Sequence, residues 1–206
     1  MTETASNLHP TFQRMLSRDR KEALIKQTGL VIWLYGLSGS GKSTIAIGLE
    51  KKLHQDGILT QLLDGDNIRT GLNKNLGFSD EDRVENIRRI AEVAKLHAEI
   101  GVATIASFIT PKRSLRSNAR EIIGNADFLE IYVHCNFDTC EARDVKGLYA
   151  KAKAGNLPQF TGRDSSFEPP DNSSPADLVI ETDQESPEES IEKLYQTVSK
   201  RVQLNS

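Results

Sequence analysis

The chain has few cysteines and no long hydrophobic run, and both features narrow its class. Its 206 residues include only two cysteines, Cys135 and Cys140. Two thiols without a histidine cluster indicate neither a disulfide framework nor a zinc site, so we expect both to be reduced and mostly buried. No stretch approaches the ~20 apolar residues that span a bilayer, and residues 1–26 carry no apolar signal core. We therefore expect a cytoplasmic protein without a membrane partner.

An excess of basic residues is also missing. Lysine and arginine number 26 against 29 aspartates and glutamates, which gives a formal net charge of −3 without a long basic run. This balance argues against a nucleic-acid partner, although a local basic pocket for a small anion is compatible with it. The apolar fraction of 37% and the charged fraction of 27% are typical of a globular protein. The length fits one medium-sized domain.

Five short apolar runs have the character of buried strands. They are nearly continuous rather than alternating, as expected for parallel strands that are covered on both faces. Segments with helical spacing separate them, so we predict an α/β fold, a three-layer sandwich with a mostly parallel five-stranded sheet. The strand candidates are residues 30–35, 59–63, 102–108, 129–135 and 178–180, and the helix candidates are residues 42–55, 83–100, 111–123, 138–154 and 187–202.

Two segments depart from this alternation. Residues 1–28 lack a strong core pattern, so we treat them as an N-terminal extension, either an outer helix or a mobile segment, before a domain of residues 29–206. The segment 156–175 is rich in Pro, Ser, Gly and Asp. A loop of this length inside a compact domain is usually functional, so we predict a lid at about residues 146–175. A passive surface excursion is the alternative.

Residues 36–43 match the phosphate-binding loop pattern G-x-x-x-x-G-K-[ST] in full, between a predicted strand and a predicted helix. The glycines allow the chain to curl so that backbone N–H groups point at phosphate oxygens, and the helix start adds a positive dipole end. This predicts a P-loop kinase fold that binds ATP and Mg²⁺. Lys42 is expected to reach the β- and γ-phosphates and Ser43 to ligate the metal. The predicted ATP-binding residues here are Gly36, Leu37, Ser38, Gly39, Ser40, Gly41, Lys42, Ser43 and Thr44.

A second polar motif, Asp64-Gly65-Asp66-Asn67, follows the second predicted strand. The carboxyl ends of neighbouring parallel strands converge, so this turn should face the phosphate loop. Two carboxylates there can divide the work. Asp64, nearer the strand, is expected to hold magnesium, and Asp66 to accept the proton of an attacking hydroxyl. The alternative is ordinary turn chemistry with a helix N-cap, and both roles can hold at once.

Several motifs together resemble the adenylylsulfate kinase (APS kinase) family, over roughly residues 28–182. The resemblance implies transfer of the γ-phosphate of ATP to the 3′-hydroxyl of adenylyl sulfate (APS). The products would be 3′-phosphoadenylyl sulfate (PAPS) and ADP, within sulfate assimilation, and the resemblance also implies a homodimer. The phosphate loop alone indicates only a nucleotide, whereas the later blocks are more specific. The matching blocks are residues 36–44, Leu63 to Arg69, Leu76 to Ser79, Asp82 to Arg89, Cys140 to Tyr149, Phe160 to Gly162 and Asp164-Ser165.

The resemblance implies an APS-binding set beside Asp66. Arg69, Arg83 and Asn86 match positions that bind the sulfonyl-phosphate group and the ribose, and arginine suits such oxyanions because it forms paired hydrogen bonds. Phe78 and Phe160 match the aromatic residues that sandwich the acceptor's adenine. Plain core packing is the alternative for the two phenylalanines.

The resemblance also gives roles to two cations and a threonine. Arg143 and Lys146 match lid-side contacts to ATP, and Lys146 would offset charge on the transferred phosphoryl group. A solvated helix face is the alternative for both. Thr110 stands where many family members carry a serine that has been assigned to a phosphoenzyme. We expect direct transfer, which needs no such residue.

Two other functions are compatible with a phosphate loop. One is a P-loop kinase of another small metabolite, which would not need the Asp-Gly-Asp-Asn motif and the Arg/Asn acceptor set. The other is a regulatory nucleotide-binding protein that holds ATP without turnover. That reading predicts the loss of Lys42, Ser43 or Asp66, and all three are present. The motifs therefore favour the APS kinase interpretation.

Overall fold

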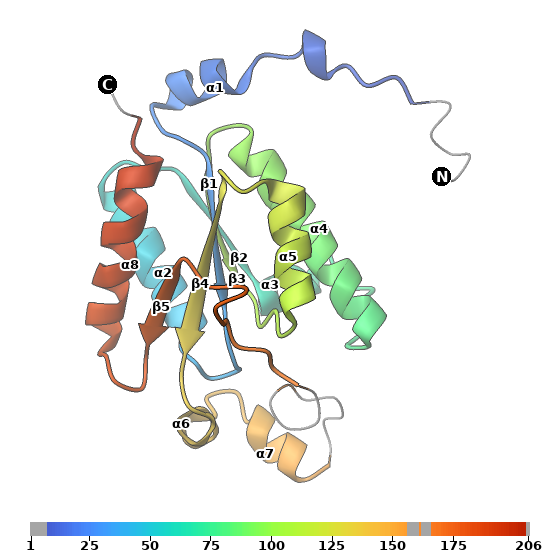
Figure 1. The fold of residues 1–206 in the computed structure, drawn as a ribbon, viewed down its shortest axis with the longest axis vertical. Helices are drawn as coiled ribbons and strands as arrows, with labels where there is room; N and C mark the ends of the chain where they lie inside the picture. Colours follow the sequence, from blue (N-terminus) through green and yellow to red (C-terminus); the bar gives the residue numbers. More distant parts are fainter. Residues whose placement is uncertain (1–7, 156–160, 162–165, 205–206) are drawn as a thin grey trace.

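A computed structural model describes residues 8–155, 161 and 166–204 of the chain (Figure 1). Its five strands form one sheet in the order β2-β3-β1-β4-β5, and every neighbouring pair is parallel. The predicted five-stranded sheet is confirmed. The strands are β1 (Leu30–Tyr35), β2 (Thr60–Asp64), β3 (Ala103–Ser107), β4 (Phe128–His134) and β5 (Leu178–Glu181).

Helices cover both faces of the sheet (Figure 1), and β1 shows why its apolar run does not alternate. Leu30, Ile32 and Leu34 pack with residues of α2 and α8, while the alternate residues Val31, Trp33 and Tyr35 pack with α4 and α5. All six side chains are buried, because the strand is covered on both sides. The predicted three-layer α/β sandwich is therefore confirmed. The covering helices are α2 (Lys42–Gln55), α4 (Asp80–Ala98), α5 (Arg113–Ile123) and α8 (Pro187–Val202).

The predicted helix over residues 138–154 is wrong as a single element. The structure has α6 (Phe137–Arg143) and α7 (Leu148–Lys153) instead. Gly147 adopts a left-handed conformation with φ of 63°, and the Asp144 carboxylate accepts hydrogen bonds from the backbone N–H groups of Tyr149 and Ala150. The carboxylate starts a new helix there. The break places Lys146 on a loop rather than on a helix face.

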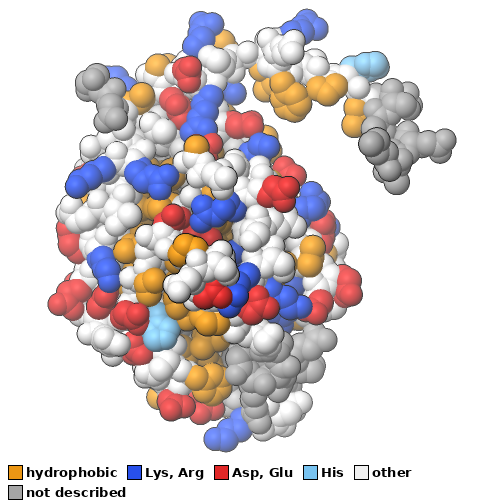
Figure 2. Space-filling model, in the orientation of Figure 1, with side chains coloured by type: hydrophobic (Ala, Val, Ile, Leu, Met, Phe, Trp, Pro, Cys, Tyr) orange, Lys and Arg blue, Asp and Glu red, His pale blue; other side chains and the backbone are white. Residues whose placement is uncertain are grey.

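The N-terminal segment carries a short 3₁₀ turn, η2 (Phe12–Arg14), and the helix α1 (Arg18–Ile25). Arg18 Nη2 donates to the Gly29 carbonyl at 2.9 Å, so α1 is tied to the start of the first strand. Before α1 the chain extends away from the sheet (Figure 1), and Figure 2 shows apolar side chains along it. Phe12, for example, is 75% exposed. The division of the chain at residue 28 stays a prediction.

The structure also bears on the two cysteines and on the search for a membrane-spanning helix. Cys135 and Cys140 are both buried free thiols, as expected. Within the described ranges, no helix combines the length and the hydrophobicity that crossing a bilayer requires.

Candidate active site

The phosphate-binding loop connects β1 to α2 with backbone that only glycine tolerates. Gly36 has a φ of 152°, and a Cβ atom there would lie 2.3 Å from the Val133 carbonyl oxygen. Gly39 has a φ of 78°, and its Cβ would lie 2.9 Å from the Cys140 carbonyl oxygen. Side chains at these positions would push the loop off β4 and α6. The glycines of the motif are therefore structural requirements of the curl.

The Lys42 side chain is buried within this curl. Its Nζ donates to the carbonyl of Gly36 at 3.0 Å and to that of Leu37 at 2.6 Å. Burial lowers the pKa of Lys42 to about 8, because desolvation disfavours the charged form. Bound phosphates would reverse that effect by supplying negative charge. The lysine thus lies within the phosphate loop, and its contact with phosphates stays a prediction.

Ser43 and Asp64 form the next part of the site. Ser43 Oγ donates to Asp64 Oδ2 at 2.8 Å, and Asp64 Oδ1 accepts from the Asp66 backbone N–H at 3.1 Å. Asp64 thereby caps the short helix α3 (Gly65–Thr70) while it contacts the phosphate-loop serine. The N-cap and the site contact occur together. Both side chains present oxygen atoms, the ligand type that Mg²⁺ prefers.

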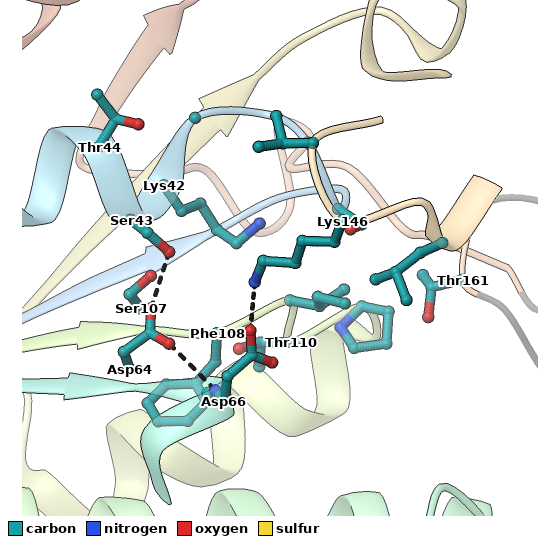
Figure 3. A pocket seen from close by; sticks show the side chains of 18 of the residues that line it. Lys42, Ser43, Thr44, Asp64, Asp66, Ser107, Phe108, Thr110, Lys146 and Thr161 are labelled. Atoms are coloured by element: carbon teal, nitrogen blue, oxygen red, sulfur yellow. Dashed lines mark hydrogen bonds and ion pairs between the residues drawn. The ribbon is translucent and has the colours of Figure 1, made fainter. Parts of the chain in front are cut away.

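Ser107 is a site residue that the sequence analysis missed. It ends β3 directly opposite Asp64 in the sheet register, and its hydroxyl is buried without a hydrogen-bond partner among the described residues. Figure 3 shows it beside Ser43 and Asp64. Parallel strands bring their carboxyl ends to one edge, so the end of β3 was a position where a site residue could be sought.

Asp66 and Lys146 face each other across the cavity. Lys146 Nζ donates to Asp66 Oδ2, and Figure 3 shows the lysine reaching toward the aspartate from the opposite wall. The Asp66 side chain is 70% exposed and that of Lys146 is 53% exposed. Such an exposed pair contributes little to stability. The structure thus brings together the predicted base and a predicted catalytic cation, eighty residues apart in sequence.

Arg69 and Arg83 both contact Phe78, whose side chain is exposed. The Arg69 guanidinium lies 4.3 Å from the ring centroid, and Arg83 Nε donates to the Phe78 carbonyl at 3.0 Å. Arg83 Nη1 also donates to Thr161 Oγ1 at 2.8 Å, which links α4 to the segment that we predict to be a lid. Burial lowers the pKa of both guanidinium groups. An anionic ligand between them would offset this desolvation.

Asn86 lies one turn along α4 from Arg83 and is buried. Its Oδ1 accepts from Asn73 Nδ2 at 2.9 Å. Asn73 is another residue that the sequence analysis missed. It is fully buried, although it lies in a polar connection that gave no core signal. The amide pair fixes the position of Asn86 beside the arginines.

Thr110 is buried and holds an interior tryptophan. Trp33 Nε1 donates to Thr110 Oγ1 at 3.0 Å, and Arg116 Nη1 donates to the Thr110 carbonyl at 3.1 Å. The backbone of Thr110 has a positive φ of 39°. Thr110 lies between the cavity and the core, and its hydroxyl binds the buried Trp33, a contact that the sequence did not indicate.

Three side chains that line the cavity support the phosphate loop. Tyr149 Oη donates to the Ser38 carbonyl at 2.8 Å, and Thr182 Oγ1 lies 2.9 Å from the Ser40 carbonyl oxygen. Arg143 Nη2 donates to the Thr182 carbonyl at 2.6 Å. Only Arg143 was predicted to belong to the site. Thr182 reaches the loop from far along the chain, and no local pattern marks it, whereas Tyr149 ends the block Cys140 to Tyr149 that carries part of the family resemblance.

A single cavity of about 640 Å³ joins most of these residues. Its volume is in the range usual for small-molecule sites. Among the predicted residues that the structure describes, Gly36, Leu37 and Ser40 do not line it. Phe160 lies outside the described residues. The predicted site residues that line the cavity are Ser38, Gly39, Gly41, Lys42, Ser43, Thr44, Asp64, Asp66, Arg69, Phe78, Arg83, Asn86, Thr110, Arg143 and Lys146.

Comparison with known proteins identifies relatives of this chain. Residues 28–181 match the adenylylsulphate kinase family model. An adenylyl-sulfate kinase of Bacteroides fragilis is 56% identical over 200 residues, which cover 97% of this chain and 98% of that protein.

Two solved structures are also similar. The Mycobacterium tuberculosis APS kinase CysC, in complex with AMPPNP and APS, is 42% identical, with a TM-score of 0.79 over 84% of this chain and 98% of that one. A hexameric APS kinase from Thiobacillus denitrificans is 27% identical, with a TM-score of 0.63 over 88% of this chain and 31% of that one.

Proposed function

The chain belongs to the adenylylsulfate kinase family, and from this premise we propose how its residues transfer the γ-phosphate of ATP to the 3′-hydroxyl of adenylyl sulfate. The observation that carries the assignment of roles is the arrangement of one cavity. The phosphate loop with Lys42 lies on one side, the paired arginines lie on the other, and Asp66 lies between them. The reaction yields PAPS and ADP and belongs to sulfate assimilation.

ATP binds along residues 36–44 in this proposal. The backbone N–H groups of the curl and the ammonium group of Lys42 hold the phosphates, and Arg143 contacts the nucleotide from the side of α6. Its hydrogen bond to the Thr182 carbonyl supports this placement, because it holds the guanidinium at the edge of the cavity. The donor site therefore uses mostly backbone, with two cationic side chains.

Ser43 and Asp64 suit magnesium. Their hydroxyl and carboxylate oxygens are neighbours at 2.8 Å beside the phosphate loop, and hard cations prefer such ligands. When bound, Mg²⁺ would neutralise charge on the β- and γ-phosphates. Ser107 lies opposite Asp64, and its buried hydroxyl has no partner among the described residues. This hydroxyl is therefore available to the metal-binding part of the site.

Adenylyl sulfate binds on the opposite side in this proposal. Arg69 and Arg83 hold its oxyanions, Asn86 its ribose, and Phe78 stacks on its adenine; Phe160 is expected on the other face of the adenine. The contact of Arg69 with the Phe78 ring and that of Arg83 with the Phe78 carbonyl support one shared subsite. An acidic lining would repel the sulfate and phosphate, and these residues supply cations instead.

Asp66 takes the proton of the 3′-hydroxyl, and the phosphoryl group passes directly to that oxygen. The Lys146 ammonium, which is paired with Asp66, is free to move to the transferred phosphoryl group once both ligands are present. The lid at about residues 146–175 excludes water, since an open site would hydrolyse ATP. Thr110 needs no phosphorylated state in this scheme. Its hydrogen bond with Trp33 supports a structural role.

We also place the enzyme in the cytoplasm as a homodimer. Its use of ATP and its two unpaired cysteines support the compartment. Family resemblance is the ground for the dimer, and a relative from T. denitrificans is hexameric. Light scattering coupled to gel filtration would give the mass directly. A mass near 23 kDa for the 22.9 kDa chain would contradict the dimer.

A coupled ADP-release assay tests the proposed function. Purified chain with Mg-ATP should release ADP only when adenylyl sulfate is added, and chromatography should identify PAPS as the product. The amount of PAPS formed should equal the amount of ADP released. Turnover with a different small acceptor, together with silence toward adenylyl sulfate, would reject the acceptor site proposed here. ADP release without any acceptor would reject the role of the lid.

A further inference from the structure

A second polar cluster lies at the carboxyl ends of β4 and β5, outside the cavity. It consists of His134, Glu181 and Asp183, each of which offers one ligand atom within 4.8 Å of the others. None of the three lines the cavity that holds the proposed substrates. The two buried thiols, Cys135 and Cys140, are not part of the cluster either. The proposed kinase reaction makes no use of these side chains.

The sheet itself brings the three residues together. His134 and Glu181 are direct partners in the parallel register of β4 and β5, and Asp183 follows two residues later along the same chain. Glu181 Oε2 is in hydrogen-bond contact with His134 Nδ1. The side chains of His134 and Glu181 are about one-third exposed, so solvent ions can reach them. The register of β4 with the edge strand β5 therefore sets the positions of His134 and Glu181.

Asp183 provides an independent indication of a ligand. Its side chain is only 8% exposed, and its Oδ2 accepts from the Asn136 backbone N–H at 3.0 Å and from Asn136 Nδ2 at 2.6 Å. Its Oδ1 is buried and has no hydrogen-bond partner among the described residues. That oxygen lies 4.0 Å from His134 Nδ1. Asn136 therefore fixes the carboxylate with Oδ1 directed toward His134, and that oxygen is available to a ligand.

We propose that His134, Glu181 and Asp183 form a binding site for a divalent transition metal ion of the Zn²⁺ class. One imidazole nitrogen and two carboxylate oxygens suit this class, whereas Mg²⁺ and Ca²⁺ prefer oxygen ligands throughout. The two carboxylates balance the charge of the ion. Three protein ligands leave a position for water. The ion would take the place of the proton between His134 and Glu181 and would satisfy Asp183 Oδ1.

The proposed metal site lies next to Thr182, which supports the phosphate loop. Thr182 lies between two of the ligands, and its hydroxyl is 2.9 Å from the Ser40 carbonyl oxygen and 3.0 Å from that of His134. The Thr182 carbonyl accepts from Arg143. An ion at this site would therefore hold the backbone segment that supports the donor side of the cavity, and we expect it to raise the melting temperature of the protein.

Metal titration tests the proposal without using the kinase reaction. Tag-free protein, stripped with a chelator and kept free of nucleotide, is titrated with Zn²⁺ in a calorimeter, and thermal unfolding is followed with and without the ion. We expect one site per chain and a rise in melting temperature. His134→Ala and the near-isosteric Asp183→Asn should each weaken Zn²⁺ binding at least about tenfold and abolish the rise.

Two control variants make every outcome decisive. His54→Ala removes an exposed histidine of α2 and should bind Zn²⁺ like the wild type. Asp66→Asn should also bind Zn²⁺ like the wild type, because Asp66 lines the cavity and is not part of the cluster. Loss of binding in Asp66→Asn but not in Asp183→Asn would place the ion in the cavity and overturn the proposal. Equal Zn²⁺ binding by the wild type, His134→Ala and Asp183→Asn would overturn it as well, and would leave the cluster as an ion pair. Circular dichroism of each variant checks that it folds.

Discussion

The two sides of the cavity are built in different ways. The side that we propose for ATP, the donor side, is a backbone curl whose carbonyls are held by Tyr149 and Thr182 and whose lysine is buried. The side that we propose for adenylyl sulfate, the acceptor side, consists of side chains that contact one another, such as Arg69 on Phe78, and that are exposed in part. Backbone groups cannot be removed by substitution, whereas side chains can. Single substitutions on the acceptor side should therefore separate the two ligands.

The largest expected effect comes from the residue between the two sides. Asp66→Asn keeps the shape of the side chain but removes the base, so kcat should fall by about 10²–10⁴-fold. The dissociation constant of ATP should change by less than about twofold, since Asp66 lies outside the curl. Stopped assays of PAPS formation and calorimetry with ATP measure the two quantities.

Asp56→Asn is the matched control for that experiment. Asp56 is an exposed aspartate at the end of α2 whose carboxylate accepts from the Tyr195 hydroxyl. This variant should turn over like the wild type. A near-normal kcat in Asp66→Asn would show that Asp66 is not the catalytic base.

A pH effect of intermediate size probes the donor side. Burial holds the pKa of Lys42 at about 8, below its usual value, so in the free enzyme the ammonium deprotonates as the pH rises through 8. In the proposed site, ATP binds the charged form of Lys42. Its affinity should therefore fall roughly tenfold between pH 7 and pH 9, because one proton must be taken up above the pKa.

The affinity of ATP at several pH values, measured by calorimetry, gives this profile. Lys42→Arg is the comparison, because a guanidinium stays charged throughout the range and should give a flat profile. For folding, the sign is opposite. The unfolded lysine holds its proton to a higher pH than the folded one, so this group makes the protein more stable as the pH rises above 8. A flat ATP profile in the wild type would contradict the buried charge.

The smallest effect on catalysis is expected at Thr110. Thr110→Val keeps the shape but leaves the Trp33 N–H without its acceptor, so the free energy of unfolding should fall by about 1–3 kcal/mol. Because transfer is direct in this account, kcat should stay within about threefold of the wild type. Denaturant unfolding and the coupled assay measure the two values. Thr110→Ser retains the hydroxyl, and activity in Ser but not in Val would indicate a phosphorylated intermediate.

The difference between the two sides also explains what could be predicted from sequence. The curl at residues 36–43 is a contiguous motif, and the five apolar runs correspond to the five strands, because burial on both faces leaves a local signal. Thr182, which supports the loop, and Asn73, the amide partner of Asn86, come from distant segments and follow no local pattern; Tyr149 lies in a motif block, but that block gave no sign of its contact with the loop. The predicted helix over residues 138–154 failed because the Asp144 carboxylate caps a second helix there. The contact of Lys146 with Asp66 depends on that break.

The separation of the two sides is tested most directly by the affinities of one variant, Arg83→Ala, for both nucleotides. The affinity for adenylyl sulfate should fall about 10–100-fold, as expected for the loss of hydrogen bonds to a charged group, and the affinity for ATP should not change. Arg88→Ala is the control, since Arg88 lies on the same helix and pairs with Glu85. Equal losses for both nucleotides, or an unchanged affinity for adenylyl sulfate, would contradict the account.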